Sequence, residues 1–105
     1  MPSQLKAWID RIAVAGKTFA YTEKGPTGLA GGKTVIIASS RGGFYGPDTP
    51  LFSIDHQEKY LTAVFGFFGI KDIRFLRAEG VNIGPEARQK AIGAAERDVV
   101  QLLAA

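Results

Sequence analysis

The chain has 105 residues, 46% hydrophobic and 22% charged, a composition that suits one compact domain and excludes a disordered chain. Thirteen Lys and Arg against ten Asp and Glu give a net charge of +3, scattered along the chain, which argues against a nucleic-acid or membrane-binding patch. Cysteine is absent, so disulfides, thiolate metal sites and cysteine nucleophiles are excluded.

The N-terminal segment does not resemble a secretory signal. MPSQLKAWIDRI has charged and polar side chains within its first eleven residues, and no apolar run follows a basic start. The longest uninterrupted apolar stretch, residues 63–70, is far shorter than the roughly 20 residues of a membrane span. We therefore expect a soluble cytoplasmic protein.

The first predicted element is a helix over residues 3–15. Its apolar side chains, spaced as one helical face, are Leu5, Trp8, Ile9 and Ile12. Gly16 is a suitable stop, and Lys6 and Asp10 are spaced to pair on the opposite face. Residues 17–32 are rich in glycine and contain the strand-like run TFAYT, which predicts an excursion with one small hairpin.

Two strands and two helices follow. The β-branched run TVIIA (34–38) predicts a strand covered on both faces, ending in a small loop at residues 39–43. Asp55 and Glu58 form a capping-box pattern that opens a helix over 55–68, whose expected buried stripe is Leu61, Val64, Phe65 and Phe68. Gly69 is expected to end this helix. The run DIRFLRA (72–78) predicts a second strand. The segment Gly84-Pro85-Glu86 then predicts the start of a helix that runs nearly to residue 105. The expected stripe of this last helix is Ala91 or Ile92, Ala95, Val99, Leu102 and Leu103.

This order is an α/β layout with a parallel, right-handed βαβ crossover. Two parallel strands make a poor sheet, yet the run 34–38 has the composition of a strand with neighbours on both sides. The pattern is that of the second half of a larger doubly wound fold.

Most catalytic motifs are missing. The single histidine, His56, follows a cap residue and reads either as a general base or, more simply, as a solvated first-turn side chain. With one His and no Cys, a catalytic zinc site lacks its preferred ligands. The sequence has neither a nucleophile-elbow serine nor a phosphate-binding P-loop, so no catalytic or metal-ligating residue is assigned.

Three features could bind a ligand. The loop Ser39-Ser40-Arg41-Gly42-Gly43 follows an apolar strand, where open α/β sheets bind ligands, although a plain turn explains it equally well. Phe67 falls off the buried stripe of its helix, which suggests association or a merely exposed ring. Tyr21 either packs the hairpin or forms an aromatic wall for a flat ligand.

The segments PSQLK…D, TF-x-YTE, SRGG, GF-x-G and AEG occur in order from Pro2 to the last helix. In combination they closely resemble the FMN-dependent NADH-azoreductase family, which are flavodoxin-like quinone and azo-dye reductases. The resemblance implies a three-layer α/β fold with a parallel sheet, of which residues 1–105 form a single partial flavodoxin-like domain, its C-terminal half. It also implies a homodimer with FMN at the dimer interface.

The activity that this resemblance implies is reduction of azo compounds and quinones by NADH or NADPH, in a ping-pong cycle through the flavin. Carried over by position, Ser40, Arg41, Gly42 and Gly43 would bind the flavin. Tyr21 and Phe67 would lie on the substrate side.

The family's first half, including the loop that holds the FMN phosphate, has no counterpart in this sequence. Because the phosphate supplies much of the anchoring in such sites, flavin binding by this chain alone is expected to be weak or lost. The alternative interpretation is a non-catalytic homologue that acts only as an association module.

We also expect the strand at 34–38 to lack its inner neighbour, leaving an exposed apolar edge. The prediction is that the chain self-pairs through these residues or is otherwise not a stable monomer. Light scattering at micromolar concentration should therefore give a mass above the 11.3 kDa of one chain. A monodisperse monomer would contradict this.

Overall fold

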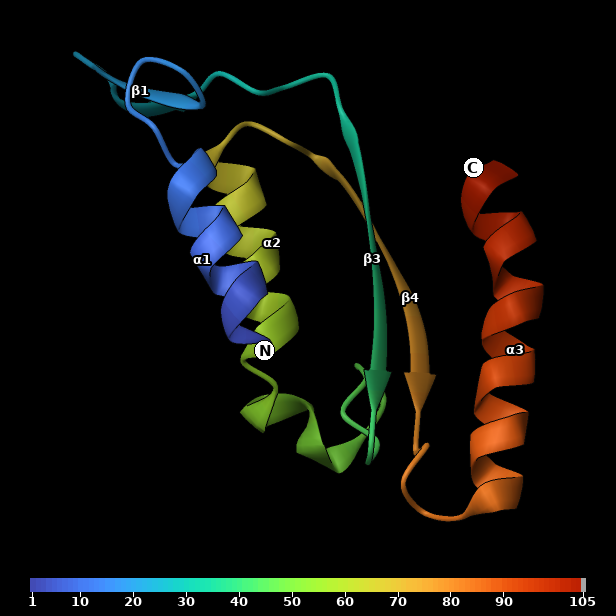
Figure 1. Cartoon of the computed structure of the whole chain (residues 1–105). Coiled ribbons are helices and arrows are strands. Elements are labelled where there is room, and N and C mark those ends of the chain that lie inside the picture. Colours follow the sequence, from blue (N-terminus) through green and yellow to red (C-terminus); the bar gives the residue numbers. More distant parts are fainter. Residues whose placement is uncertain (105) are drawn as a thin grey trace. The chain divides into compact units, whose positions relative to one another are not determined.

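A computed structural model describes residues 1–104. Helix α1 (Ser3–Ile12) is followed by strands β1 (Phe19–Thr22), β2 (Gly25–Gly28) and β3 (Thr34–Arg41) (Figure 1). A short 3₁₀ helix, η1 (Pro50–Ile54), precedes α2 (Gln57–Phe67), β4 (Asp72–Glu79) and α3 (Pro85–Ala104). The expected order of elements, including the small hairpin, is confirmed.

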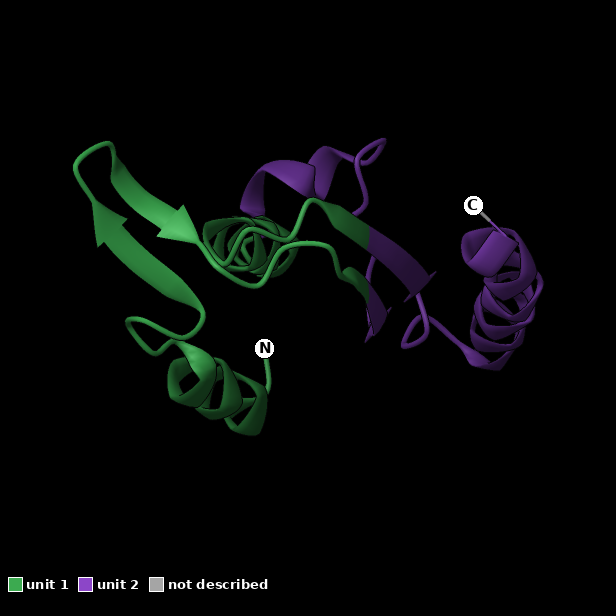
Figure 2. Cartoon of the chain, turned by 90° about the horizontal axis from the view of Figure 1, so that it is seen from above, with its two compact units in different colours: residues 1–35, 56–73 green, residues 36–55, 74–105 purple. Residues whose placement is uncertain are grey.

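The chain forms two compact units, coloured separately in Figure 2. Unit 1 comprises residues 1–35 and 56–73, and unit 2 comprises residues 36–55 and 74–105. That residues 1–105 constitute one partial domain stays a prediction.

The apolar core lies in unit 1, where Glu58 of α2 is buried as well. Its buried side chains are Ile9, Leu61, Phe65, Phe68 and Ile70. Three of them come from the predicted stripe of α2 and the segment that ends it, while the fourth member of that stripe, Val64, is partly buried. Burial of large apolar side chains is the main favourable term in folding, at about 1.5–3 kcal/mol for each.

Helix α1 ends at Ile12 rather than at the predicted residue 15. The Thr18 hydroxyl donates to the Ile12 carbonyl (2.6 Å) and accepts the Val14 N–H (3.1 Å), satisfying groups that a longer helix would have paired internally. The expected pair of Lys6 and Asp10 is present (2.5 Å), and its hydrogen bond raises the pKa of Lys6. Trp8, predicted on the buried stripe, is 51% exposed. Ile9 is the one side chain of α1 that is buried, so the apolar face of this helix is only partly covered.

Helix α2 begins at Gln57, two residues later than predicted, with His56 as its N-cap residue. Its end is as predicted. Gly69 has a φ of +90°, which favours glycine, and its N–H donates to the Gly66 carbonyl.

Strands β1 and β2 pair antiparallel, with Phe19 opposite Gly28 and Thr22 opposite Gly25. The hairpin is joined to the end of α2 by the Ala30 N–H, which donates to the Phe68 carbonyl (2.8 Å). A Cβ atom added to Gly28 would lie 2.1 Å from the Gly69 nitrogen, so only glycine permits this backbone approach.

Strands β3 and β4 are hydrogen-bonded neighbours that run in the same direction (Figure 1). Strand β3 extends to Arg41, so the prediction that residues 39–41 form a loop is wrong. The interpretation of residues 34–38 as covered on both faces is also wrong for this chain. Side chains of β3 alternate between exposed and partly buried, and Ile36 is 42% exposed, so one face of the strand is left largely uncovered. Within residues 1–104, β4 is the one strand paired with β3.

Helix α3 starts at Pro85 and runs to Ala104, close to the predicted bounds. None of its described side chains is buried, so its predicted apolar stripe is only partly covered. Ile92 is 44% exposed and Leu103 is 63% exposed.

We predict that Gly28→Ala destabilises the chain by about 1–3 kcal/mol, because the added methyl meets backbone atoms that cannot rotate away. Gly66→Ala is the matched control: nothing lies within 4 Å of its added Cβ, so it should leave stability unchanged or raise it by up to about 1 kcal/mol. Urea unfolding of the two variants measures the difference. Equal midpoints would show that the hairpin does not approach α2 so closely.

Candidate functional site

The candidate site in unit 2 is built on the carboxyl end of β3. Ser40 and Arg41 are the last residues of the strand, and Gly42 and Gly43 follow it. Three backbone carbonyls at this point, those of Arg41, Gly42 and Gly43, accept hydrogen bonds. The donors are the N–H groups of Val81 (3.1 Å), Asn82 (3.3 Å) and Gly80 (3.0 Å), respectively. The turn after β4 thus binds the loop through the backbone carbonyl groups of the loop.

The N–H groups of the same loop are differently placed. Within residues 1–104, the backbone N–H groups of Gly42, Gly43 and Phe44 donate to no protein acceptor. Gly42 and Phe44 are exposed, and Gly43 is partly buried. Three successive donors without protein partners can serve a ligand that presents several acceptors.

Close packing around the two glycines limits substitution. A Cβ on Gly42 would lie 3.1 Å from the Asn82 Cβ, and one on Gly43 would lie 3.3 Å from the Tyr45 ring. Both approaches are tighter than an ordinary van der Waals contact. Glycine therefore keeps the loop close to its neighbours and its N–H groups open.

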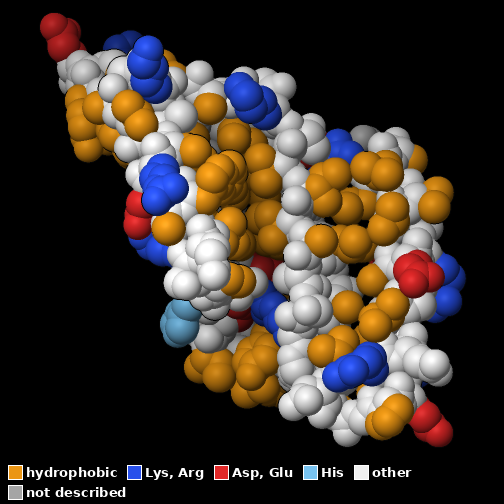
Figure 3. All heavy atoms as spheres, in the orientation of Figure 1, with side chains coloured by type: hydrophobic (Ala, Val, Ile, Leu, Met, Phe, Trp, Pro, Cys, Tyr) orange, Lys and Arg blue, Asp and Glu red, His pale blue; other side chains and the backbone are white. Residues whose placement is uncertain are grey.

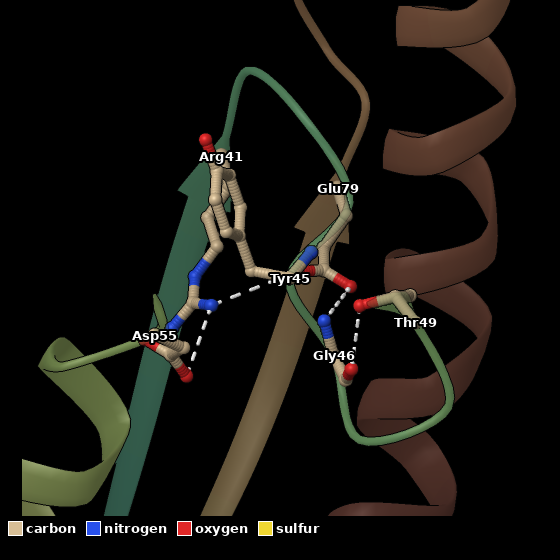
Figure 4. Close-up of polar contacts among 6 residues, drawn as sticks. All are labelled: Arg41, Tyr45, Gly46, Thr49, Asp55 and Glu79. Carbon is tan, nitrogen blue, oxygen red and sulfur yellow. Dashed lines mark hydrogen bonds and ion pairs between the residues drawn. The ribbon is translucent and has the colours of Figure 1, made fainter. Parts of the chain in front are cut away.

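Arg41 lies between two carboxylates (Figure 4). Its Nη1 is 3.2 Å from Asp55 Oδ2 and 3.7 Å from Glu79 Oε2, and all three side chains are no more than 13% exposed. The Arg41 guanidinium is also 5.9 Å from the centre of the Tyr45 ring. Since the guanidinium is engaged inside unit 2, Arg41 serves the loop as an internal anchor.

Glu79 holds the next part of the loop. Its two carboxylate oxygens accept the backbone N–H groups of Tyr45 (2.9 Å) and Gly46 (3.1 Å). The Gly46 carbonyl then accepts the Thr49 hydroxyl (2.7 Å), which closes the turn (Figure 4). The sequence pointed to Glu79 only through the AEG segment of the family resemblance, without a role of its own; an acidic residue directly after the mainly apolar run 73–78 was the available signal.

Ser40 occupies a second environment. It lines a pocket of about 350 Å³ between β3, β4 and α3, together with Ile92 and Glu96. The neighbouring Ser39 hydroxyl is buried and has no hydrogen-bond partner within residues 1–104. The structure thus places the two serines beside this pocket and the two glycines in the loop beyond the strand.

Tyr21 and Phe67 belong to unit 1, where both contact Phe19. The Phe19 ring centre is 5.5 Å from that of Tyr21, in an edge arrangement, and 4.8 Å from that of Phe67. Tyr21 is 73% exposed and Phe67 is 37% exposed. Phe67 therefore lies off the buried stripe as predicted, and the two rings flank a shared aromatic contact.

His56 is exposed, in keeping with its interpretation as a solvated first-turn residue. Residues 1–104 contain no group of three or more His, Cys, Asp or Glu side chains placed to hold a metal ion. Over the same residues, no helix has the length and apolar character needed to cross a membrane.

The profile of the flavodoxin-like fold family matches residues 1–103. The chain therefore belongs to this family, and the fold class expected from the sequence is confirmed.

Curated relatives are similar over nearly the whole chain. An FMN-dependent NADH:quinone oxidoreductase from Rhizobium meliloti (strain 1021) is 62% identical over 101 residues, covering 96% of this chain and 48% of the relative. A protein of the same name from Azospirillum brasilense is 58% identical over 99 residues, covering 94% and 48%. The chain spans about half the length of these relatives.

Solved structures agree. An azoreductase from Bacillus anthracis str. Sterne superposes with a TM-score of 0.85 at 33% identity, covering 97% of this chain and 49% of that one. An FMN-dependent NADH-azoreductase from Bacillus anthracis str. Ames Ancestor, in complex with FMN, gives a TM-score of 0.80 at 36% identity, covering 97% and 50%. The predicted resemblance to azoreductases and quinone reductases is confirmed.

We predict that Arg41→Met destabilises the chain by about 3 kcal/mol or more, because it leaves the buried Asp55 and Glu79 carboxylates without their shared cation. Lys6→Met removes an exposed pair with Asp10 and should change stability little. Urea unfolding at pH 7 compares the two variants. Similar losses in both would mean that the Arg41 contacts do not anchor unit 2.

Proposed function

We propose that this chain provides the flavin-ring side of an FMN-dependent NAD(P)H oxidoreductase that reduces quinones and azo compounds. The observation that carries the proposal is the row of three N–H groups at Gly42, Gly43 and Phe44, held by contacts on the opposite side of the loop. The names of the curated relatives and the FMN complex of a structural neighbour support it.

The loop suits FMN chemically. The pyrimidine edge of a flavin presents carbonyl oxygens and ring nitrogens as acceptors, which matches consecutive N–H donors. The bound FMN would supply the two-electron chemistry, accepting a hydride from NAD(P)H and delivering it to the acceptor in a ping-pong cycle. Gly42 and Gly43 bind the ring through their backbones, with Ser40 beside them and Arg41 anchoring the strand end.

Tyr21 and Phe67 are proposed to contact the substrate. Their partly exposed rings, braced by Phe19, offer an apolar wall to a flat azo compound or quinone. The relatives' names favour NADH as the electron donor.

The second candidate is a non-catalytic association module, and exposed apolar side chains favour it. Apolar atoms are spread over the face drawn in Figure 3. Elsewhere in the described chain as well as on this face, large apolar side chains are exposed, among them Trp8 (51%), Ile36 (42%), Val100 (70%) and Leu103 (63%). Surfaces of this kind mark association sites, and we propose a homodimer under either function.

The first test is a titration of dilute FMN with the whole chain, followed by the flavin's visible spectrum and fluorescence. Three neutral hydrogen bonds contribute about 3 kcal/mol, so we expect a Kd in the millimolar range. The bound flavin should be bleached by NADH faster than free FMN in the same buffer. Free-flavin behaviour at all protein concentrations would reject the enzyme and leave the association module.

A pair of glycine variants tests the loop itself. We predict that Gly42→Ala weakens FMN binding about tenfold, because its methyl crowds Asn82 and shifts the N–H groups. Gly84→Ala, whose added Cβ would meet nothing within 4 Å, is the control and should bind FMN as the unaltered chain does. Equal binding by the two variants would place the flavin elsewhere.

A further inference from the structure

We propose that Glu79 is a positioning residue for the flavin: by holding the backbone of Tyr45 and Gly46, it aims the N–H groups of Gly42, Gly43 and Phe44 at the ring. This inference rests on the proposed function and adds to it a residue outside the loop. Glu79 is the last residue of β4, so its position is fixed by a different strand from the one that carries the loop.

The first support is the geometry of its contacts. Glu79 gives one oxygen to the Tyr45 N–H (2.9 Å) and the other to the Gly46 N–H (3.1 Å). Two bonds to one carboxylate fix both the distance and the orientation of the segment, and bonds to a charged acceptor are stronger than neutral ones. With an Oε2–Arg41 Nη1 distance of 3.7 Å, the carboxylate also faces a buried cation.

The second support is that the neighbouring residues are shaped to this contact. Gly46 is buried, and a Cβ there would lie 2.8 Å from Glu79 Oε1, so a side chain at this position would displace the carboxylate. Gly80 has a φ of +76°, and a Cβ on it would lie 2.5 Å from the Phe44 ring. Both glycines therefore bring the end of β4 close against the loop.

The third support is the division of the loop's polar groups. The carbonyls of residues 41–43 are bound by the turn that follows Glu79, and the N–H groups of residues 45 and 46 are bound by Glu79 itself. Between these two anchors, the N–H groups of residues 42–44 have no protein acceptor within residues 1–104. A segment fixed at both ends presents its donors in one arrangement, which lowers the entropy cost of binding a rigid ring.

The test compares Glu79→Gln with Glu86→Gln, a variant of an exposed glutamate at the start of α3. A glutamine keeps one acceptor oxygen but turns its NH₂ group toward the other backbone N–H, so one bond is lost. Circular dichroism and a urea midpoint establish that each variant is folded. Amide hydrogen exchange by NMR then reports the loop without any ligand, and an FMN titration followed at the Gly42, Gly43 and Phe44 amides reports binding.

For Glu79→Gln we expect exchange at Tyr45 or Gly46 to become about tenfold faster and the Kd for FMN to rise about tenfold. The FMN-induced shifts at residues 42–44 should shrink, and Glu86→Gln should match the unaltered chain. Exchange within twofold of the unaltered chain overturns the proposal, as does faster exchange with unchanged FMN affinity and shifts. If the unaltered chain binds no FMN, the proposed function fails first and the positioning role fails with it, an outcome distinct from the other two.

Discussion

The contact on which the site depends is the buried cation of Arg41 between Asp55 and Glu79. Removing charges from water is expensive, so a cluster of this kind forms only where the surrounding polar groups are also satisfied. Glu79 meets that requirement with two backbone N–H groups of the loop. Through these two bonds, the buried charge cluster is connected to the backbone of the surface loop and helps to fix its path.

As a consequence, the carbonyl groups and the N–H groups of the loop that follows β3 have different hydrogen-bond partners. Its carbonyls are bound to the turn after β4, and its N–H groups at residues 42–44 have no acceptor among the described residues of the chain. Parallel strands make this arrangement natural, since the carboxyl ends of β3 and β4 meet at the same edge, where α/β proteins bind their ligands. Gly42 and Gly43 are small enough to permit close contact with neighbouring residues, and the hydrogen-bond donors of the loop are backbone N–H groups.

Local signals in the sequence predicted much of this structure. The stripe of α2, its end at Gly69 and the start of α3 at Pro85 each depend on neighbouring residues, and all three are confirmed. The errors concern partners distant in sequence. Strand β3 runs on to Arg41 because residues 80–82 pair with the loop, and Glu79 acts on residues more than thirty positions away. No periodicity reports such contacts, and the motif resemblance contained Glu79 in its AEG segment without assigning it a role.

The two groups of predicted site residues are held by independent sets of contacts. The loop at residues 40–43 is ordered by groups within unit 2, and the rings of Tyr21 and Phe67 by Phe19 within unit 1. Under the proposed function, recognition of the flavin ring by the loop would therefore not require the aromatic wall to be in place. It is nevertheless weak by itself, since three neutral hydrogen bonds correspond to about 3 kcal/mol, near the millimolar range. Tight flavin binding needs further contacts, such as a phosphate anchor or a stacked side chain, and these are what a partner surface would have to add.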